Sequence, residues 1–125
     1  MNKKRVLLVD DETSLTRLIK LNLEVSGPYE VMVENKGSQA IKTAMAFKPD
    51  IIFLDITMPD KSGYDVACEI KSTHALSSIP IVFMTAMVTM EEVFKAGGII
   101  GGEPFLAKPA NMGDIIATIK THLVA

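Results

Sequence analysis

The chain has 125 residues, a formal net charge of −2 and 48% hydrophobic residues. This length suits a single domain over residues 1–125, and the apolar content excludes a disordered chain. The scattered basic residues give no sign of nucleic-acid binding, and the single Cys68 excludes an internal disulfide and disfavours a zinc site. No apolar run approaches the ~20 residues of a membrane span, and the basic start meets acids too early for a signal peptide, so we expect a cytoplasmic protein.

The first half of the chain alternates between predicted strands and helices. Residues 5–9 (RVLLV) form an apolar run typical of a strand buried on both faces. A helical pattern follows and ends at residues 26–28 (SGP); its apolar face carries Leu15, Leu18, Ile19 and Leu23. Residues 29–34 (YEVMVE) alternate, which indicates a strand with one polar face. Ser38 is expected to cap the next helix and Pro49 to stop it; its apolar face carries Ala40, Ile41, Ala44 and Met45.

The middle of the chain repeats this order. Residues 50–55 (DIIFLD) and 80–85 (PIVFMT) are further continuous apolar runs and are predicted to be buried strands. Residues 58–63 (MPDKSG) have the composition of a loop, and a helix is expected over residues 64–72. Residues 89–92 (TMEE) form a capping box, which predicts another helix start.

The last part of the chain is less regular before its final helix. The helix after Thr89 must be short because Gly97 and Gly98 follow. The link over residues 97–102 holds four glycines, so we expect its backbone to be loosely specified and poorly protected from exchange. Residues 104–108 (PFLAK) are predicted to be an edge strand. Asn111 is expected to cap a helix whose apolar face carries Met112, Ile115, Ile116, Ile119 and Leu123.

Five strand–helix repeats predict an α/β fold, in which a mostly parallel sheet carries helices on both faces. Ligands bind such sheets at the carboxyl ends of the strands. Those ends carry Asp10 and Asp11, Asp55, Thr85 and Lys108, which should converge on one edge. Three carboxylates in a partly desolvated cleft repel one another, and a divalent cation would relieve this repulsion. Oxygen ligands without histidine or cysteine favour Mg²⁺.

These residues also carry a family resemblance that covers essentially the whole chain. They are the acidic pair Asp10–Asp11, Asp55 in FLDITMPD, Thr85 in FMTA and Lys108 in FLAKPA. All stand at the ends of predicted strands, with the spacing of that family. In this arrangement the sequence resembles a response-regulator receiver domain of two-component signalling, of the chemotaxis response-regulator type. The resemblance implies a flavodoxin-like fold with five parallel strands in the order 2-1-3-4-5.

The resemblance also implies roles for the site residues. Asp55 would be the phosphoacceptor, which takes a phosphoryl group from a sensor histidine kinase or a phosphotransfer protein. Lys108 and Thr85 would contact the phosphoryl oxygens. The metal, Mg²⁺ or Mn²⁺, would be held by Asp11, Asp55, the backbone carbonyl of Thr57 and, through water, Asp10. Glu12 is expected to be a first-turn helix residue, where the helix dipole favours an acid.

The expected output of such a domain is a change of surface rather than turnover of a separate substrate. By resemblance, Thr85 and Phe105 would form the switch, and the fourth helix, fifth strand and fifth helix would bind a downstream protein or an effector domain absent from this chain. The Lys108–Pro109 peptide bond is expected to be cis. The glycine-rich link at 97–102 departs from the family pattern, which leaves the form of the switch open.

Two other functions occur on a related fold and are alternatives to a receiver domain. A metal-dependent phosphohydrolase with an aspartyl nucleophile needs a second acid two residues after it, and Thr57 stands there. A flavin or nucleotide module needs a glycine- or serine-rich phosphate loop after the first strand, whereas residues 10–14 (DDETS) are acidic. Flavin absorbance or turnover of a phosphoester would identify either alternative.

Overall fold

The computed structural model describes residues 3–85, 99–100, 103–108 and 111–123, with backbone alone at 99–100 and 103–104. Several sequence predictions lie outside these residues: the short helix after Thr89, the glycines of the 97–102 link and the peptide bond to Pro109. Among the described residues, no helix has the length and apolar character needed to cross a membrane.

The strands form one sheet with the order β2-β1-β3-β4-β6-β5. The first five are parallel, so the predicted order 2-1-3-4-5 is confirmed, with β6 as the predicted fifth strand. Their bounds are β1 Lys4–Val9, β2 Tyr29–Glu34, β3 Ile51–Asp55, β4 Ile81–Thr85, β5 Ile99–Ile100 and β6 Glu103–Ala107. The two residues of β5 pair antiparallel with β6, so β6 lies between β4 and β5 and the prediction that it is an edge strand was wrong. The sequence did not predict β5, because two residues between glycine pairs carry too little pattern to distinguish a strand from a loop.

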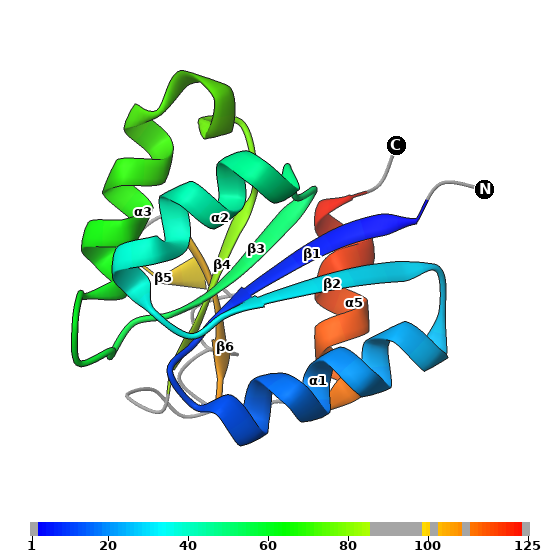
Figure 1. Cartoon of the computed structure of the whole chain (residues 1–125). Coiled ribbons are helices and arrows are strands. Elements are labelled where there is room, and N and C mark those ends of the chain that lie inside the picture. Colours follow the sequence, from blue (N-terminus) through cyan, green and yellow to red (C-terminus); the bar gives the residue numbers. More distant parts are fainter. Residues whose placement is uncertain (1–2, 86–98, 101–102, 109–110, 124–125) are drawn as a thin grey trace.

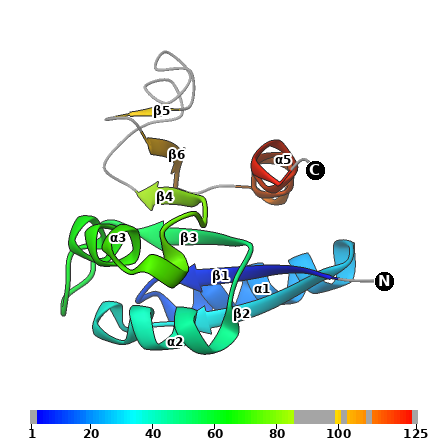
Figure 2. The ribbon, with the colours of Figure 1, turned by 90° about the horizontal axis from the view of Figure 1, so that it is seen from above.

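Helices cover both faces of the sheet, as Figure 2 shows from above. Helices α1 (Thr13–Ser26) and α5 (Met112–His122) lie on one face, and α2 (Ala40–Phe47) and α3 (Gly63–Ser72) lie on the other (Figure 1). Short 3₁₀ turns cover Gly37–Gln39 (η1) and His74–Leu76 (η2). Predicted helices and observed helices therefore agree for the described part of the chain, including the cap at Asn111, whose Oδ1 accepts from the Asp114 N–H at 2.8 Å.

The continuous apolar runs are explained by two cores, one on each side of the sheet. Along β1, Val6 and Leu8 pack with Ile19 of α1 and Ile115 of α5. The alternate residues of β1 pack against α2 and α3. Successive side chains on a strand point to opposite faces, so a strand covered on both sides needs apolar residues at every position.

Three details of the helix predictions were wrong. Ser38 does not cap α2: it lies inside η1, and its N–H donates to Asp60 Oδ2 at 2.9 Å. Leu18 and Met45, expected on buried faces, are 57% and 44% exposed. On α1 the buried residues are Thr16, Ile19 and Leu23, so the buried face includes a threonine and leaves Leu18 out.

Leu23 and Leu18 offer a matched test of this packing. Leu23 is 0% exposed, whereas Leu18 on the same helix is 57% exposed. We expect Leu23→Ala to lower the free energy of unfolding by about 2–5 kcal/mol, because it leaves a cavity in the core. Leu18→Ala should change it by less than about 0.5 kcal/mol. Urea unfolding measures both; equal losses would contradict the assignment of the buried face of α1.

Candidate functional site

The strand register brings the polar strand ends together. Val9 pairs with Leu54, so the residues that follow them, Asp10 and Asp55, lie next to each other at the end of β1 and β3. On the other side, β4 pairs with β3 and then with β6. The Lys108 N–H donates to the Thr85 carbonyl at 2.9 Å, which joins the ends of β6 and β4. The predicted convergence of these residues on one edge of the sheet is confirmed.

Three carboxylates form the acidic centre of this edge. Asp10, Asp11 and Asp55 each offer an oxygen within 4.8 Å of the others, a grouping that could hold a metal ion. Asp10 and Asp55 are 1% and 3% exposed, so water screens their charges poorly. A carboxylate-only donor set is what hard divalent cations prefer.

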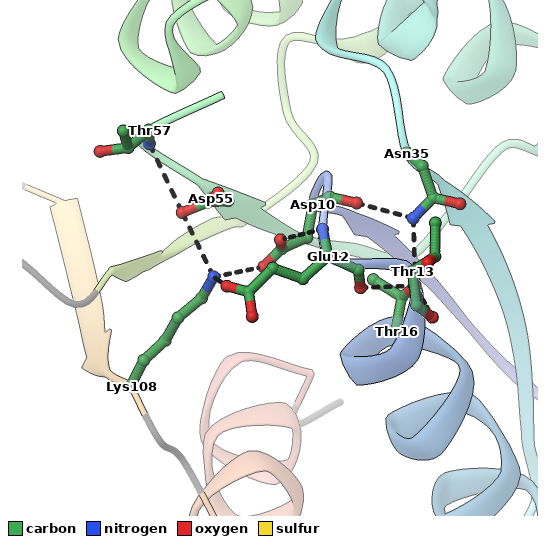
Figure 3. Close-up of polar contacts among 8 residues, drawn as sticks. All are labelled: Asp10, Glu12, Thr13, Thr16, Asn35, Asp55, Thr57 and Lys108. Atoms are coloured by element: carbon green, nitrogen blue, oxygen red, sulfur yellow. Dashed lines mark hydrogen bonds and ion pairs between the residues drawn. The ribbon is translucent and has the colours of Figure 1, made fainter. Parts of the chain in front are cut away.

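Lys108 supplies the positive charge of the site. Its Nζ lies 2.6 Å from Asp10 Oδ2, 2.8 Å from Glu12 Oε1 and 3.5 Å from Asp55 Oδ1 (Figure 3). Burial alone would lower the pKa of the Lys108 ammonium, but its hydrogen bonds to Asp10 and Glu12 and the charge of Asp10 outweigh burial and hold the pKa above its ordinary value. The lysine is therefore charged near neutral pH.

Asp55 has a raised pKa in the acidic centre. Burial, together with the negative charge of Asp10, raises the pKa of Asp55 to about 6, although Lys108 and the Thr57 N–H act in the opposite direction. The Thr57 N–H donates to Asp55 Oδ1 over a long 3.4 Å. Within the described residues, the Thr57 N–H and, at 3.5 Å, the Lys108 ammonium lie near this carboxylate, whose oxygens can act as ligands or as a nucleophile.

A second layer of polar residues fixes the acidic loop after β1, and sequence reasoning missed it. Asn35, at the end of β2, donates from Nδ2 to the Asp10 carbonyl at 2.7 Å and to Thr16 Oγ1 at 3.1 Å (Figure 3). The Glu12 N–H donates to Asp10 Oδ1 at 2.9 Å. The polar residue that ends β2 was the available signal, because β2 lies beside β1 and their ends reach the same edge.

Gly63 lets the chain after β3 fold back tightly on Asp55. A Cβ at Gly63 would lie 2.1 Å from the backbone oxygen of Asp55 and 2.7 Å from Cα of Ile56. The Gly63 N–H donates to the Ile56 carbonyl at 2.8 Å. A side chain at this position would push the backbone of Asp55 aside, so the glycine that was read as loop composition is a requirement of the site.

Phe105 lies in the core beneath the site. It is 5% exposed, and its ring centroid is 5.1 Å from that of Phe83 on β4. Phe83 in turn lies 5.3 Å from the ring of Tyr64 on α3, which is 50% exposed. Phe105 is therefore a packed core residue, and its role as a switch stays a prediction.

The raised pKa of Asp55 predicts a pH dependence of stability in EDTA. Between about pH 4 and pH 6 the folded chain binds a proton at Asp55 that the unfolded chain has lost, so unfolding becomes easier as pH rises through this window. Asp55→Asn removes this loss and should raise the free energy of unfolding by about 2 kcal/mol at about pH 7.5, with little gain at about pH 4. Denaturant unfolding at both pH values measures it, with Asp65→Asn as a surface control. A gain that does not depend on pH would contradict the assignment.

Comparison with known proteins identifies the family of this chain. Residues 6–120 match the family model of the response regulator receiver domain. The chain is 36% identical, over 98% of its length, to the alkaline phosphatase synthesis transcriptional regulatory protein PhoP of Bacillus subtilis, but covers 49% of that protein. It is 33% identical to the polar-differentiation response regulator DivK of Brucella anthropi, with 96% of each chain covered.

A solved structure agrees with the fold. Chemotaxis protein CheY4 of Vibrio cholerae superposes with a TM-score of 0.81 at 26% identity, with 97% of this chain and 99% of that chain covered. The chain spans about half the length of several curated relatives, PhoP among them, and nearly all of DivK. The family match covers most of the chain, and the chain belongs to the response-regulator receiver family of two-component phosphorelay signalling.

Proposed function

We propose that this chain accepts a phosphoryl group on Asp55 from a phosphohistidine of a sensor kinase or phosphotransfer protein. An Asp55 carboxylate oxygen attacks phosphorus, the phosphorus–nitrogen bond breaks, and the imidazole nitrogen leaves with the electron pair and takes a proton. The observation that carries this proposal is the position of Asp55, nearly buried between an acidic pair and the Lys108 ammonium. Phosphoryl transfer depends mainly on positioning and charge, which this arrangement supplies.

The residues around Asp55 fit a divalent cation. Mg²⁺, or Mn²⁺, would be held by Asp11, Asp55 and the backbone carbonyl of Thr57, with Asp10 acting through water. When bound, the cation neutralises the carboxylates and the phosphoryl oxygens. Lys108 then offers its donors to the phosphoryl group, and the Thr85 hydroxyl offers another. The raised pKa of Asp55 supports this proposal, because burial first and the charge of Asp10 second disfavour the ionised carboxylate, which a cation would stabilise.

Thr57 supports a phosphoacceptor over a phosphohydrolase. An aspartyl phosphohydrolase needs a general acid two residues after its nucleophile, and a threonine hydroxyl does not serve as one near neutral pH. We therefore propose that the chain assists its own phosphorylation and dephosphorylation without turning over a separate substrate. The cytoplasmic location and the single-domain organisation stay predictions.

The phosphodonor protein must contact the surface next to the site, and α1 offers an apolar one. Leu18, Leu21 and Val25 are 57%, 56% and 83% exposed on the outer face of this helix. A groove of about 410 Å³ beside them is lined by Thr13, Ser14, Arg17, Leu18 and Leu21. Helix α1 begins one residue after Glu12, at the edge of the site. Exposed apolar residues of this kind are typical of protein contacts, so we assign the donor to this face.

The downstream partner is proposed to bind the surface that the fourth helix, β6 and α5 would form, with Thr85 and Phe105 as the switch. Two observations support the placement. Thr85 is 1% exposed at the end of β4. Phe105 is on β6, three residues before Lys108, and pairs with Phe83 across the two strands. Residues 86–98, which would include the fourth helix, lie outside the described part of the chain.

Phosphorylation by acetyl phosphate tests the proposed function. In Mg²⁺ the unsubstituted chain should gain the mass of one phosphoryl group by intact mass spectrometry, whereas Asp55→Asn should gain none. Asp65→Asn, an exposed aspartate in the first turn of α3, is the matched control and should behave as the unsubstituted chain. Equal labelling of Asp55→Asn would place the acceptor elsewhere and overturn the proposal.

Metal binding is tested by thermal unfolding. A cation that binds only the folded chain adds stability by mass action, so millimolar Mg²⁺ should raise Tm by about 3–8 °C over EDTA, which corresponds to roughly 1–2 kcal/mol. Asp11→Ala should lose most of this shift, and Asp65→Ala should keep it. A shift that survives in Asp11→Ala would show that Mg²⁺ binds outside the acidic centre.

A further inference from the structure

Glu12 occupies a helix-capping position but does not cap the helix. It is the N-cap residue of α1, with extended backbone and no hydrogen bond from its side chain to the helix. Serine, threonine, aspartate and asparagine are preferred at this position because their short side chains reach the free N–H groups. Glutamate gives up that contact, so the use of its side chain must be sought elsewhere.

The Glu12 carboxylate turns to Lys108 instead. Its Oε1 accepts from Lys108 Nζ at 2.8 Å, between residues 96 positions apart in the sequence (Figure 3). The backbone on either side is fixed, because the Glu12 N–H donates to Asp10 and the Glu12 carbonyl accepts from the Thr16 N–H at 3.1 Å. The side chain therefore starts from a defined point and reaches across the site. Glu12 was expected in the first turn of the helix, but it lies one residue earlier, at the N-cap.

The three carboxylates around Lys108 are unequal in distance and in exposure. The ammonium lies 2.6 Å from Asp10 and 2.8 Å from Glu12 but 3.5 Å from Asp55, the proposed phosphoacceptor. The side chains of Asp10 and Asp55 are 2% and 4% exposed, whereas that of Glu12 is 58% exposed. Breaking a buried ion pair is costly, but an exposed one is worth little and is screened by salt. Glu12 is therefore the partner that Lys108 can leave most easily.

We propose that Glu12 is a positioning residue that holds the Lys108 ammonium on the acidic-pair side of the site and releases it when a phosphoryl group forms on Asp55. The inference rests on the proposed function of Asp55. A phosphoryl group on Asp55 brings new oxygens that need the lysine donors, and the contact with Glu12 competes with them. The Glu12 carboxylate thereby slows phosphorylation in proportion to the strength of this exposed contact.

Kinetics with a small donor test the proposal. With acetyl phosphate and Mg²⁺ saturating for each variant, Glu12→Gln should be phosphorylated roughly two- to fivefold faster than the unsubstituted chain, which is the range an exposed ion pair allows. High ionic strength should narrow this difference, because salt screens the contact in the unsubstituted chain. Glu30→Gln is the control for charge. Glu30 is exposed on β2 and lies opposite Arg5 in the strand register, near the other end of the strands, so this substitution should leave the rate unchanged.

A double-mutant cycle shows whether Glu12 acts through the lysine. In a Lys108→Met background, which keeps the aliphatic stem, Glu12→Gln should give no acceleration. Acceleration of the same size in that background would mean that Glu12 acts by general charge or through the metal, and would overturn the proposal. If the single variant Glu12→Gln, which keeps Lys108, is phosphorylated on Asp55 at an unchanged or lower rate, the proposal is overturned as well. The proposed function then stays intact. If Lys108→Met reacts too slowly to follow, the salt dependence decides: an acceleration that salt does not diminish contradicts the proposal. Absence of label on Asp55 in the unsubstituted chain would instead refute the proposed function itself.

Discussion

The repulsion among three carboxylates at the end of a parallel sheet is the constraint around which this domain is built. Asp10 and Asp55 are nearly buried, and their oxygens and one of Asp11 lie within 4.8 Å of one another. Such a group costs folding free energy, and within the described residues Lys108 is the one cation with an ion pair to it. Burial and, after it, the charge of Asp10 raise the pKa of Asp55, although Lys108 acts in the opposite direction. The three carboxylates could hold a divalent cation, which would reduce this repulsion.

The fold meets this cost with backbone contacts around the site. Parallel pairing of the backbone places Asp10 beside Asp55, and the Lys108 N–H donates to the Thr85 carbonyl. Gly63 allows the chain to turn back against Asp55 where a side chain would not fit. Asn35 holds the Asp10 carbonyl from the neighbouring strand. The backbone around the acidic residues is thus positioned by groups that carry no charge, and Lys108 contacts their carboxylates.

The sequence predicted the sheet and the central residues of the site, because both depend on patterns that repeat along the chain. Apolar runs marked the buried strands, and the polar residues that end them had to meet at one edge. The roles of Glu12 and Asn35 were not predicted, since they arise from contacts between segments that are far apart in sequence. The role of Gly63 was not predicted, because it depends on how closely the chain turns back on Asp55. The prediction that Leu18 is buried was wrong, because α1 has leucines on several faces and the pattern does not show which face is buried. The buried Thr16 is polar and gave no apolar signal.

Phe105 shows that core packing and switching impose limits on each other. The ring is 5% exposed and stacks on Phe83, so turning it outward would leave a cavity of the kind that costs about 3–5 kcal/mol when an aromatic side chain is lost. A population shift requires a ligand or partner that discriminates between two conformations by a comparable free energy. A single hydrogen bond to Thr85 contributes only about 0.5–1.5 kcal/mol. Any switch at Phe105 therefore has to draw on contacts with a partner or with other parts of the chain in addition to the phosphoryl group.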